Sequence, residues 1–239
     1  MWTIASYQPV AIFSLKPAAA TSSGGRTLIC PTPFAIRMSL LDAAIRTRGL
    51  ATGQRLWPLI RGLRLKVRLP PTLTVINTFT KIVRPKKAGP SDDDGTGLIT
   101  PLTNTIAYRE YVAFGGDIGL AAQPSSGDAL PDEAVALFAH LTYLGKRGSF
   151  LQLLALPATT ESEPDATEGW TLISKDQNSF AIGGTLQMLD DCSDNMTFEQ
   201  VNIYSSNRIT LGKERILRHI VLPYRLARSS RGFSLYERI

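Results

Sequence analysis

The hydrophobic period of the chain switches repeatedly between that of a strand and that of a helix, and the order of these switches restricts the fold most strongly. Residues 4–15 mix β-branched, aromatic and other apolar side chains without helical spacing, which predicts a strand. A helix should follow, because Thr32 can cap it and Pro33 suits its first position. Apolar side chains then recur on one helical face until Gly49 ends the pattern.

Residues 61–69 alternate between polar and apolar side chains. Alternation places the apolar side chains on one face of a strand and Arg64, Lys66 and Arg68 on the other. We therefore expect one face to join the core and the other to be cationic. A second extended segment, rich in threonine and β-branched residues, is expected over residues 72–83.

The next segment, residues 84–97, is rich in proline, glycine, lysine and aspartate, so we expect a mobile hairpin tip or loop rather than a core element. Residues 104–120 predict another extended segment. A second helix should begin at Pro131 and carry an apolar stripe until Gly145 closes it. The apolar run 149–156 then predicts a short buried strand.

The predicted order is therefore strand, helix, strand, long hairpin, strand, helix, strand. This order is typical of an α+β fold built on a ferredoxin-like, RNA-recognition-type βαββαβ domain, here over residues 1–157. A β-hairpin insertion is expected at about residues 77–107 of that domain. Residues 158–175 predict an acidic surface loop, and the region 158–239 is expected to form a small β-rich C-terminal appendage.

Charge is sorted by position along the chain. Residues 1–88, 89–200 and 201–239 carry net charges of +13, −13 and +6, which together give the overall +6. A strongly basic first third attracts a polyanion, and phosphate backbones are the commonest partner because binding releases their condensed counterions. An anionic membrane surface or an ordinary solvated face are the alternatives that charge alone leaves open.

Targeting signals and cysteine usage indicate a compartment. The first residues lack the basic start and cleavage site of a signal peptide, and no run reaches the roughly 18 apolar residues of a membrane span. Cys30 and Cys192 stand alone and far apart, which favours neither a disulfide framework nor a zinc site. We expect a soluble protein of the reducing cytoplasm, without a membrane partner.

Catalytic and metal-binding patterns are weak. Metal-independent RNA cleavage usually needs a general base and acid. Of the two histidines, we expect His140 to be a packed or half-exposed helix residue and His219 to pack in an apolar run. The carboxylate runs 92–94 and 190–194 lack the remaining ligands of an EF-hand. We therefore expect no enzyme activity, no metal and no cofactor.

The turn Gly145-Lys146-Arg147-Gly148 is the strongest candidate for an RNA contact. Its glycines allow a backbone to approach a phosphate closely, while the two cations supply charge. An ordinary helix C-cap would explain only the first glycine. Tyr108 or Phe150 could stack on a base. The remaining RNA-binding candidates are Arg26, Arg37, Lys81, Arg84, Lys86, Lys87 and Arg109.

Several segments resemble a known family. Residues 27–45, from Thr-Leu-Ile-Cys-Pro to Ala-Ala-Ile, resemble the loop and first helix of the fifth CRISPR-associated protein family, part of the RAMP superfamily. Tyr-Arg-Glu-Tyr at 108–111 and Tyr-Leu-Gly-Lys-Arg-Gly-Ser-Phe at 143–150 look like its extended segment after the thumb and its glycine loop. His-Ile-Val-Leu-Pro-Tyr-Arg-Leu at 219–226 is similar to its closing strand. These segments cover most of the chain in the family's order.

The resemblance implies a non-catalytic subunit of a type I Cascade effector. Such a subunit binds the 5′ handle of CRISPR RNA, caps the filament of backbone subunits, lies beside the large subunit and supports target DNA recognition. The hairpin insertion would be its thumb. Two alternatives stay open: a RAMP endoribonuclease that processes precursor CRISPR RNA, since some family members cleave it, and a ribosomal or other scaffold RNA-binding protein.

Overall fold

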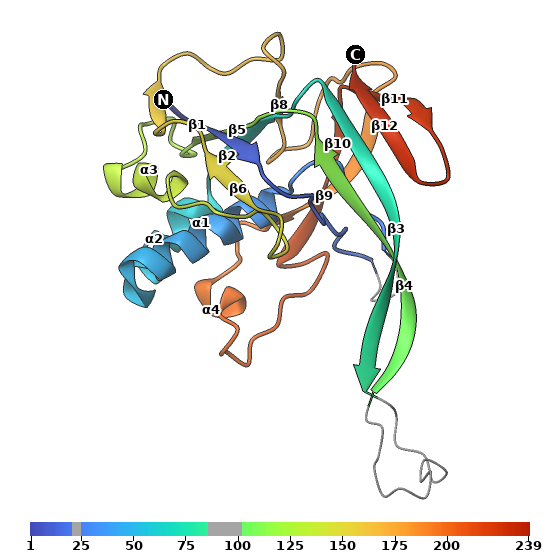
Figure 1. Ribbon diagram of the computed structural model, residues 1–239. Helices are drawn as coiled ribbons and strands as arrows, with labels where there is room; N and C mark the ends of the chain where they lie inside the picture. Colours follow the sequence, from blue (N-terminus) through green and yellow to red (C-terminus); the bar gives the residue numbers. More distant parts are fainter. Residues whose placement is uncertain (21–24, 86–101) are drawn as a thin grey trace, which may run out of the picture.

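The computed structural model describes residues 1–20, 25–85 and 102–239 (Figure 1). It combines helices with antiparallel sheets, which agrees with the mixed class predicted from the sequence. The helices are α1 (Pro33–Arg48), α2 (Leu50–Arg61), α3 (Asp132–Phe138) and α4 (Phe198–Val201). The strands are β1 (Trp2–Pro9), β2 (Arg64–Arg68), β3 (Thr72–Pro85), β4 (Leu102–Phe114), β5 (Ile118–Gln123), β6 (Leu151–Leu153), β7 (Ala158–Thr160), β8 (Trp170–Leu172), β9 (Thr185–Cys192), β10 (Arg215–Leu222), β11 (Tyr224–Ser229) and β12 (Phe233–Arg238).

The main sheet has the strand order β6-β1-β5-β2-β8, and β7 also pairs with β1. All of these pairs are antiparallel. Side chains from this sheet, from α1, α2 and α3, and from the C-terminal strands meet in one core cluster, in which Tyr7, Ile36, Leu65, Leu189 and Ile220 are all buried. None of the helices in the described part of the chain has both the length and the apolar composition needed to cross a lipid bilayer.

Helix α1 forms for the local reasons that the sequence predicted. The Thr32 hydroxyl accepts a hydrogen bond from the Ala35 amide at 3.1 Å, and Pro33 occupies the first helical position. Gly49, at a φ of 87°, ends the helix. Helix α2, which follows at once, was not predicted. It has no side-chain cap and contains Pro58, and its Trp57 indole instead donates to the Met196 carbonyl at 2.9 Å.

The second predicted helix is shorter than expected, because α3 ends at Phe138 instead of near Gly145. The Phe138 carbonyl accepts a hydrogen bond from the buried Tyr7 hydroxyl at 2.7 Å and from the Leu141 amide at 3.4 Å, so it is not available to continue the α-helical pattern. The buried strand predicted over 149–156 is also only partly correct. Strand β6 covers three residues, and Leu154 and Leu156 are exposed.

The cationic face predicted for β2 is covered at Lys66, whereas Arg64 is exposed and Arg68 is half-buried. Residues 158–175 were expected to form a surface loop, but they contain β7 and β8, which add to the main sheet at β1 and β2. Their Glu163 pairs with Lys66 at 2.7 Å, and Lys66 is only 8% exposed. The ammonium of Lys66 also lies 5.1 Å from the Trp2 ring centre. A strand pattern cannot reveal such a cover, because the covering residues come from a distant segment.

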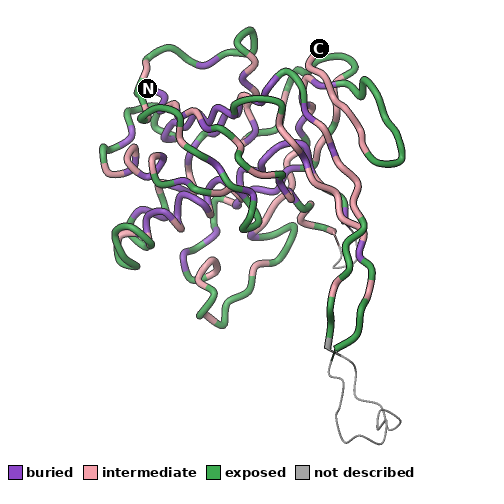
Figure 2. Tube along the Cα trace, viewed as in Figure 1, coloured by how far each residue is buried: buried purple, intermediate pink, exposed green. Residues whose placement is uncertain are grey.

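A second sheet has the order β11-β12-β3-β4 and contains the predicted hairpin insertion. The β3–β4 register runs from Leu73 opposite Phe114 to Pro85 opposite Leu102, and the hairpin extends away from the body of the molecule (Figure 1). Near the body its inner face joins the core. Towards its outer end the hairpin is largely exposed (Figure 2). Its exposed apolar side chains are Phe79, Val83, Leu102 and Ile106.

Candidate nucleic-acid interface

The Gly145–Gly148 turn is an exposed loop between α3 and β6. The Leu144 amide donates to the Ser149 carbonyl at 3.2 Å, and the Ser149 amide donates to the Lys146 carbonyl at 3.1 Å, which closes the loop. Gly145 and Gly148 have φ values of 74° and 103°, so both use backbone conformations that favour glycine. The Lys146 and Arg147 side chains are exposed and have no ion-pair partner among the described residues.

A hollow of about 280 Å³ lies beside this turn, at the first turn of α1. Lys146 lines it together with Lys16, and Arg215 closes another side. The Arg215 guanidinium pairs with Asp190 at 2.7 Å and lies 4.1 Å from the Phe34 ring centre, so it is held in place. The positive end of the helix dipole favours an anion there, although Pro33 has no amide hydrogen and the Ala35 amide is bound to Thr32. Sequence reasoning missed Lys16 and Arg215, because neither lies in a recognisable local pattern.

A second group of candidates lies where β4 meets the segment around residue 26. The Gly25 carbonyl accepts from the Glu110 amide at 2.6 Å, and the Thr27 amide donates to the Glu110 carboxylate at 3.0 Å. A side chain at Gly25 would collide with the Tyr108 carbonyl, so glycine is required there. Arg26 is exposed and close enough to Tyr108 to act on the charge of its hydroxyl.

Tyr108 is fixed by its neighbours. Its hydroxyl donates to Glu110 at 2.7 Å and also contacts the Asn77 side-chain oxygen at 3.1 Å, and its ring centre lies 5.5 Å from that of Phe79. Partial desolvation, followed by the hydrogen bond to Glu110, raises the pKa of Tyr108, and Arg26 opposes the shift. The phenol is thus a neutral, oriented donor. Its partly exposed ring is the part that could meet a base.

The other hairpin candidates differ in their surroundings. Lys81 and Arg84 are exposed on β3. Arg109 is half-buried, and its guanidinium donates to the Tyr108 carbonyl at 2.9 Å. Lys86 and Lys87, together with most of the predicted hairpin tip, lie outside the described residues.

Short contacts join the turn and the hairpin group into one flank of the molecule. The Ser14 amide donates to the Ser149 hydroxyl at 3.2 Å, and the Leu15 amide donates to the Thr27 hydroxyl at 3.0 Å. Phe13 exchanges backbone hydrogen bonds of 2.8 Å with Val112 of β4. Residues 13–15 therefore connect the Gly145–Gly148 turn to the base of the hairpin.

The prediction that Arg37 contacts RNA is wrong. This side chain is only 3% exposed and points into the protein. Its guanidinium pairs with Asp191 at 2.8 Å and donates to the Ile60 and Leu63 carbonyls at 2.8 and 2.9 Å. Its donors are therefore occupied in holding α1, α2 and β9 together.

The histidines also differ from expectation. His140 was predicted to be a packed or half-exposed helix residue and His219 to be packed in an apolar run, yet both are exposed. His140 lies beyond the end of α3, and its carbonyl accepts from Arg46 at 2.8 Å. His219 lies on β10, and its amide donates to Asp176 at 3.2 Å. The packing argument against catalysis therefore does not apply to either residue.

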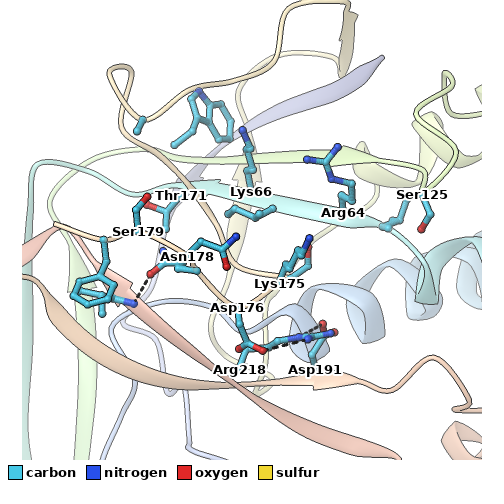
Figure 3. A pocket seen from close by; sticks show the side chains of 18 of the residues that line it. Arg64, Lys66, Ser125, Thr171, Lys175, Asp176, Asn178, Ser179, Asp191 and Arg218 are labelled. Atoms are coloured by element: carbon cyan, nitrogen blue, oxygen red, sulfur yellow. Dashed lines mark hydrogen bonds and ion pairs between the residues drawn. The ribbon is translucent and has the colours of Figure 1, made fainter.

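A larger cavity, of about 880 Å³, opens between β2, the segment 174–181 and the β9–β10 pair (Figure 3). Arg218 forms ion pairs there with Asp176 at 3.8 Å and with Asp191 at 3.3 Å. With the pairs of Arg37 and Arg215, these contacts place Asp190 and Asp191 of the 190–194 run in ion pairs. The basic residues that line the cavity are Arg37, Arg61, Arg64, Lys66, Lys175 and Arg218.

Comparison with known proteins gives one clear sequence relationship. No family model matches the chain. The CRISPR-associated protein Cas5 of Archaeoglobus fulgidus is 29% identical to it over 197 residues, which are 81% of this chain and 80% of the relative. This relationship confirms the resemblance drawn from the sequence motifs.

Solved structures are also similar to all or most of this chain. A CRISPR protein from Archaeoglobus fulgidus matches with a TM-score of 0.45 and 10% identity, covering 100% of this chain and 92% of that one. A chain of a CRISPR RNA-guided surveillance complex matches with a TM-score of 0.48 and 14% identity, covering 93% and 90%.

Proposed function

We propose that this chain, a homologue of the CRISPR-associated protein Cas5, is a non-catalytic RNA-binding subunit of a type I CRISPR Cascade effector. In this role it binds the 5′ handle of CRISPR RNA and caps the filament of backbone subunits. The observation that carries the proposal is the exposed Gly145–Gly148 turn, which carries two cations, one of which, Lys146, lines the hollow at the N-terminus of α1. Residues 13–15 connect this turn to the base of the hairpin.

The fold supports this proposal. We infer a ferredoxin-like βαββαβ unit made of β1, α1, β2, β5, α3 and β6, because the strand order β6-β1-β5-β2 and its antiparallel pairing are those of that unit. Helix α2 is an addition between α1 and β2, and the β3–β4 hairpin is inserted between β2 and β5. In this reading the hairpin is the thumb.

RNA binding would use shape and charge more than base reading. Lys146 and Arg147 supply cations at a backbone with little steric bulk, which suits a phosphate. The first turn of α1 and Lys16 extend the positive surface from the turn into the hollow. Arg26, Lys81 and the ring edge of Tyr108 would continue the path along one face of the hairpin, where unpaired bases can stack on an aromatic ring, whereas Arg84 lies on the opposite face.

The hairpin would also bind a backbone subunit. Phe79 is 67% exposed and Ile106 is 70% exposed, and register places them on the same face as Val83 and Leu102. Contiguous exposed apolar side chains are typical of a protein interaction site. The large subunit and target DNA would then lie beside this end of the assembled effector.

The second candidate function is cleavage of precursor CRISPR RNA. The exposure of His140 and His219 favours keeping precursor RNA cleavage as the alternative, since an exposed imidazole can reach a substrate. Homology to Cas5 does not favour the ribosomal or scaffold alternative.

Sequencing of the RNA that copurifies with the full chain, expressed with its neighbouring CRISPR subunits, tests the proposal. We expect CRISPR RNA with a defined 5′ end. The Lys146→Ala, Arg147→Ala variant should recover less of it, and each lost phosphate contact should reduce the slope of log affinity against log salt by about 0.7. The matched control, Arg208→Ala with Lys213→Ala, removes two exposed cations elsewhere. Ribosomal RNA, or equal losses in both variants, would contradict the proposal.

A further inference from the structure

The sheet β11-β12-β3-β4 has two faces of different character. On one face Leu73, Val75 and Val112 are buried in the core. On the opposite face the register places Tyr111 of β4 beside Ile76 of β3, and Ile76 beside Phe233 of β12. These three side chains are partly exposed and do not belong to the core cluster. We call the face that carries this row the outer sheet face.

Arginines border the outer sheet face on the side of β11, which is the edge strand. Along β12, Leu235 and Glu237 point to the same side as Phe233. Arg225 lies opposite Glu237, and Arg228 lies opposite Leu235, so both arginines are on the outer sheet face. Arg231 lies in the turn between β11 and β12. All three arginines are exposed and have no ion-pair partner within the described part of the chain. The β11–β12 hairpin is half-buried to exposed along most of its length (Figure 2).

Charge on the outer sheet face is one-sided. The strand register also places Arg109, which lies beside Thr78, and Arg84, which lies beside Thr103, on this face. Glu237 is its single acid among the described residues of the four strands. The Arg228 guanidinium lies 5.8 Å from the Phe233 ring centre, so cation and ring form one surface.

We propose that the outer sheet face, with Arg225, Arg228 and Arg231, binds a stretch of unpaired polynucleotide. Aromatic rings on an open sheet accept bases by stacking whatever the sequence, and arginines at the margin hold the phosphates. Arginine and aromatic residues are also enriched in protein interfaces, but the excess of cations over acids on this face favours a polyanion. This surface goes beyond the proposed handle-binding role, since the Tyr108 ring and the outer sheet face lie on opposite sides of the same sheet.

Two variants of the full chain test the two halves of this surface. The charge variant is Arg225→Gln, Arg228→Gln, Arg231→Gln, and the aromatic variant is Tyr111→Leu, Phe233→Leu. Fluorescence anisotropy measures their binding to oligo(U), oligo(dT) and a DNA duplex over a range of salt. The charge variant should lose about 0.7 of salt slope per phosphate contact. The aromatic variant should bind both single strands about tenfold more weakly with an unchanged slope.

Controls separate this surface from net charge, unfolding and the handle site. Arg208→Gln with Lys213→Gln removes exposed charge elsewhere and should bind like the wild type, and thermal melting should show that every variant folds. In the Lys146→Ala, Arg147→Ala background, the aromatic variant should still lose affinity. If only that background weakens binding, the outer sheet face is not a site, although the handle proposal stands.

The oligonucleotides also distinguish the possible ligands. Similar losses on oligo(U) and oligo(dT) assign the face to any unpaired strand, and a loss on one of them alone assigns it to RNA or DNA. Single-strand affinity that is unchanged in both variants would overturn the proposal. If single-strand affinity is unchanged and the variants also lose a protein subunit from the reconstituted effector, the face is a protein interface instead.

Discussion

At the scale of single residues, Arg37 shows how a basic side chain can be structural. It lies between Asp191 and two backbone carbonyls, and Arg218 contacts the same aspartate from β10 at 3.3 Å. Arg37→Met should reduce the free energy of unfolding by about 3 kcal/mol, because a buried carboxylate loses a partner and two carbonyls lose their donors. Urea denaturation measures this. The control Arg46→Met, which removes an exposed pair with Asp42, should cost at most about 1 kcal/mol.

The ion pair of Glu163 and Lys66 should make stability sensitive to acid. The hydrogen bond from Lys66 lowers the pKa of Glu163 below its ordinary value of 4.5. A lowered pKa means that this contribution is complete above pH 4.5 and is lost as the pH falls through the pKa in the folded state. Glu163→Gln should therefore flatten the acid limb of melting temperature against pH, whereas Glu168→Gln, at an exposed position, should not. Parallel curves for Glu163→Gln and the wild type would contradict this.

At the scale of elements, the β3–β4 hairpin combines a packed base with an exposed apolar end. Phe79→Ser with Ile106→Ser should leave the melting temperature nearly unchanged, because exposed substitutions usually alter stability by less than about 0.5 kcal/mol. The same variant should lose backbone subunit in size-exclusion chromatography of the reconstituted effector. Ile203→Ser with Tyr204→Ser changes two exposed apolar residues outside the hairpin and serves as the control. Full assembly of the hairpin variant would show that this face is not an interface.

At the scale of the whole molecule, the proposed role is to hold RNA without cutting it. The isolated chain, incubated with precursor CRISPR RNA in the absence of metal, should yield no cleavage product. His140→Ala and His219→Ala should leave the length of copurifying RNA unchanged in the assembled effector. Denaturing gels and end mapping give both readouts. Cleavage by the isolated chain that disappears in either variant would establish the endoribonuclease alternative.

The sequence by itself determined those features whose causes are local. The cap of Thr32, the fixed φ of Pro33 and the positive φ of Gly49 define α1. Alternation identified the buried side of β2, and turn composition identified the inserted hairpin. The Gly145–Gly148 turn could also be recognised, since two glycines and two cations adjoin in the chain.

Only the tertiary structure decided where distant segments meet. Helix α2 has no side-chain cap and is held through Trp57, whose partner lies near residue 196. Tyr7, from the first strand, binds the carbonyl of Phe138, the last residue of α3. The same cause buries Arg37 against Asp191, covers Lys66 with Glu163 and places Arg215 and Lys146 in the lining of one hollow. A charge pattern records how many cations a chain carries, but whether each faces solvent depends on contacts between residues far apart in sequence.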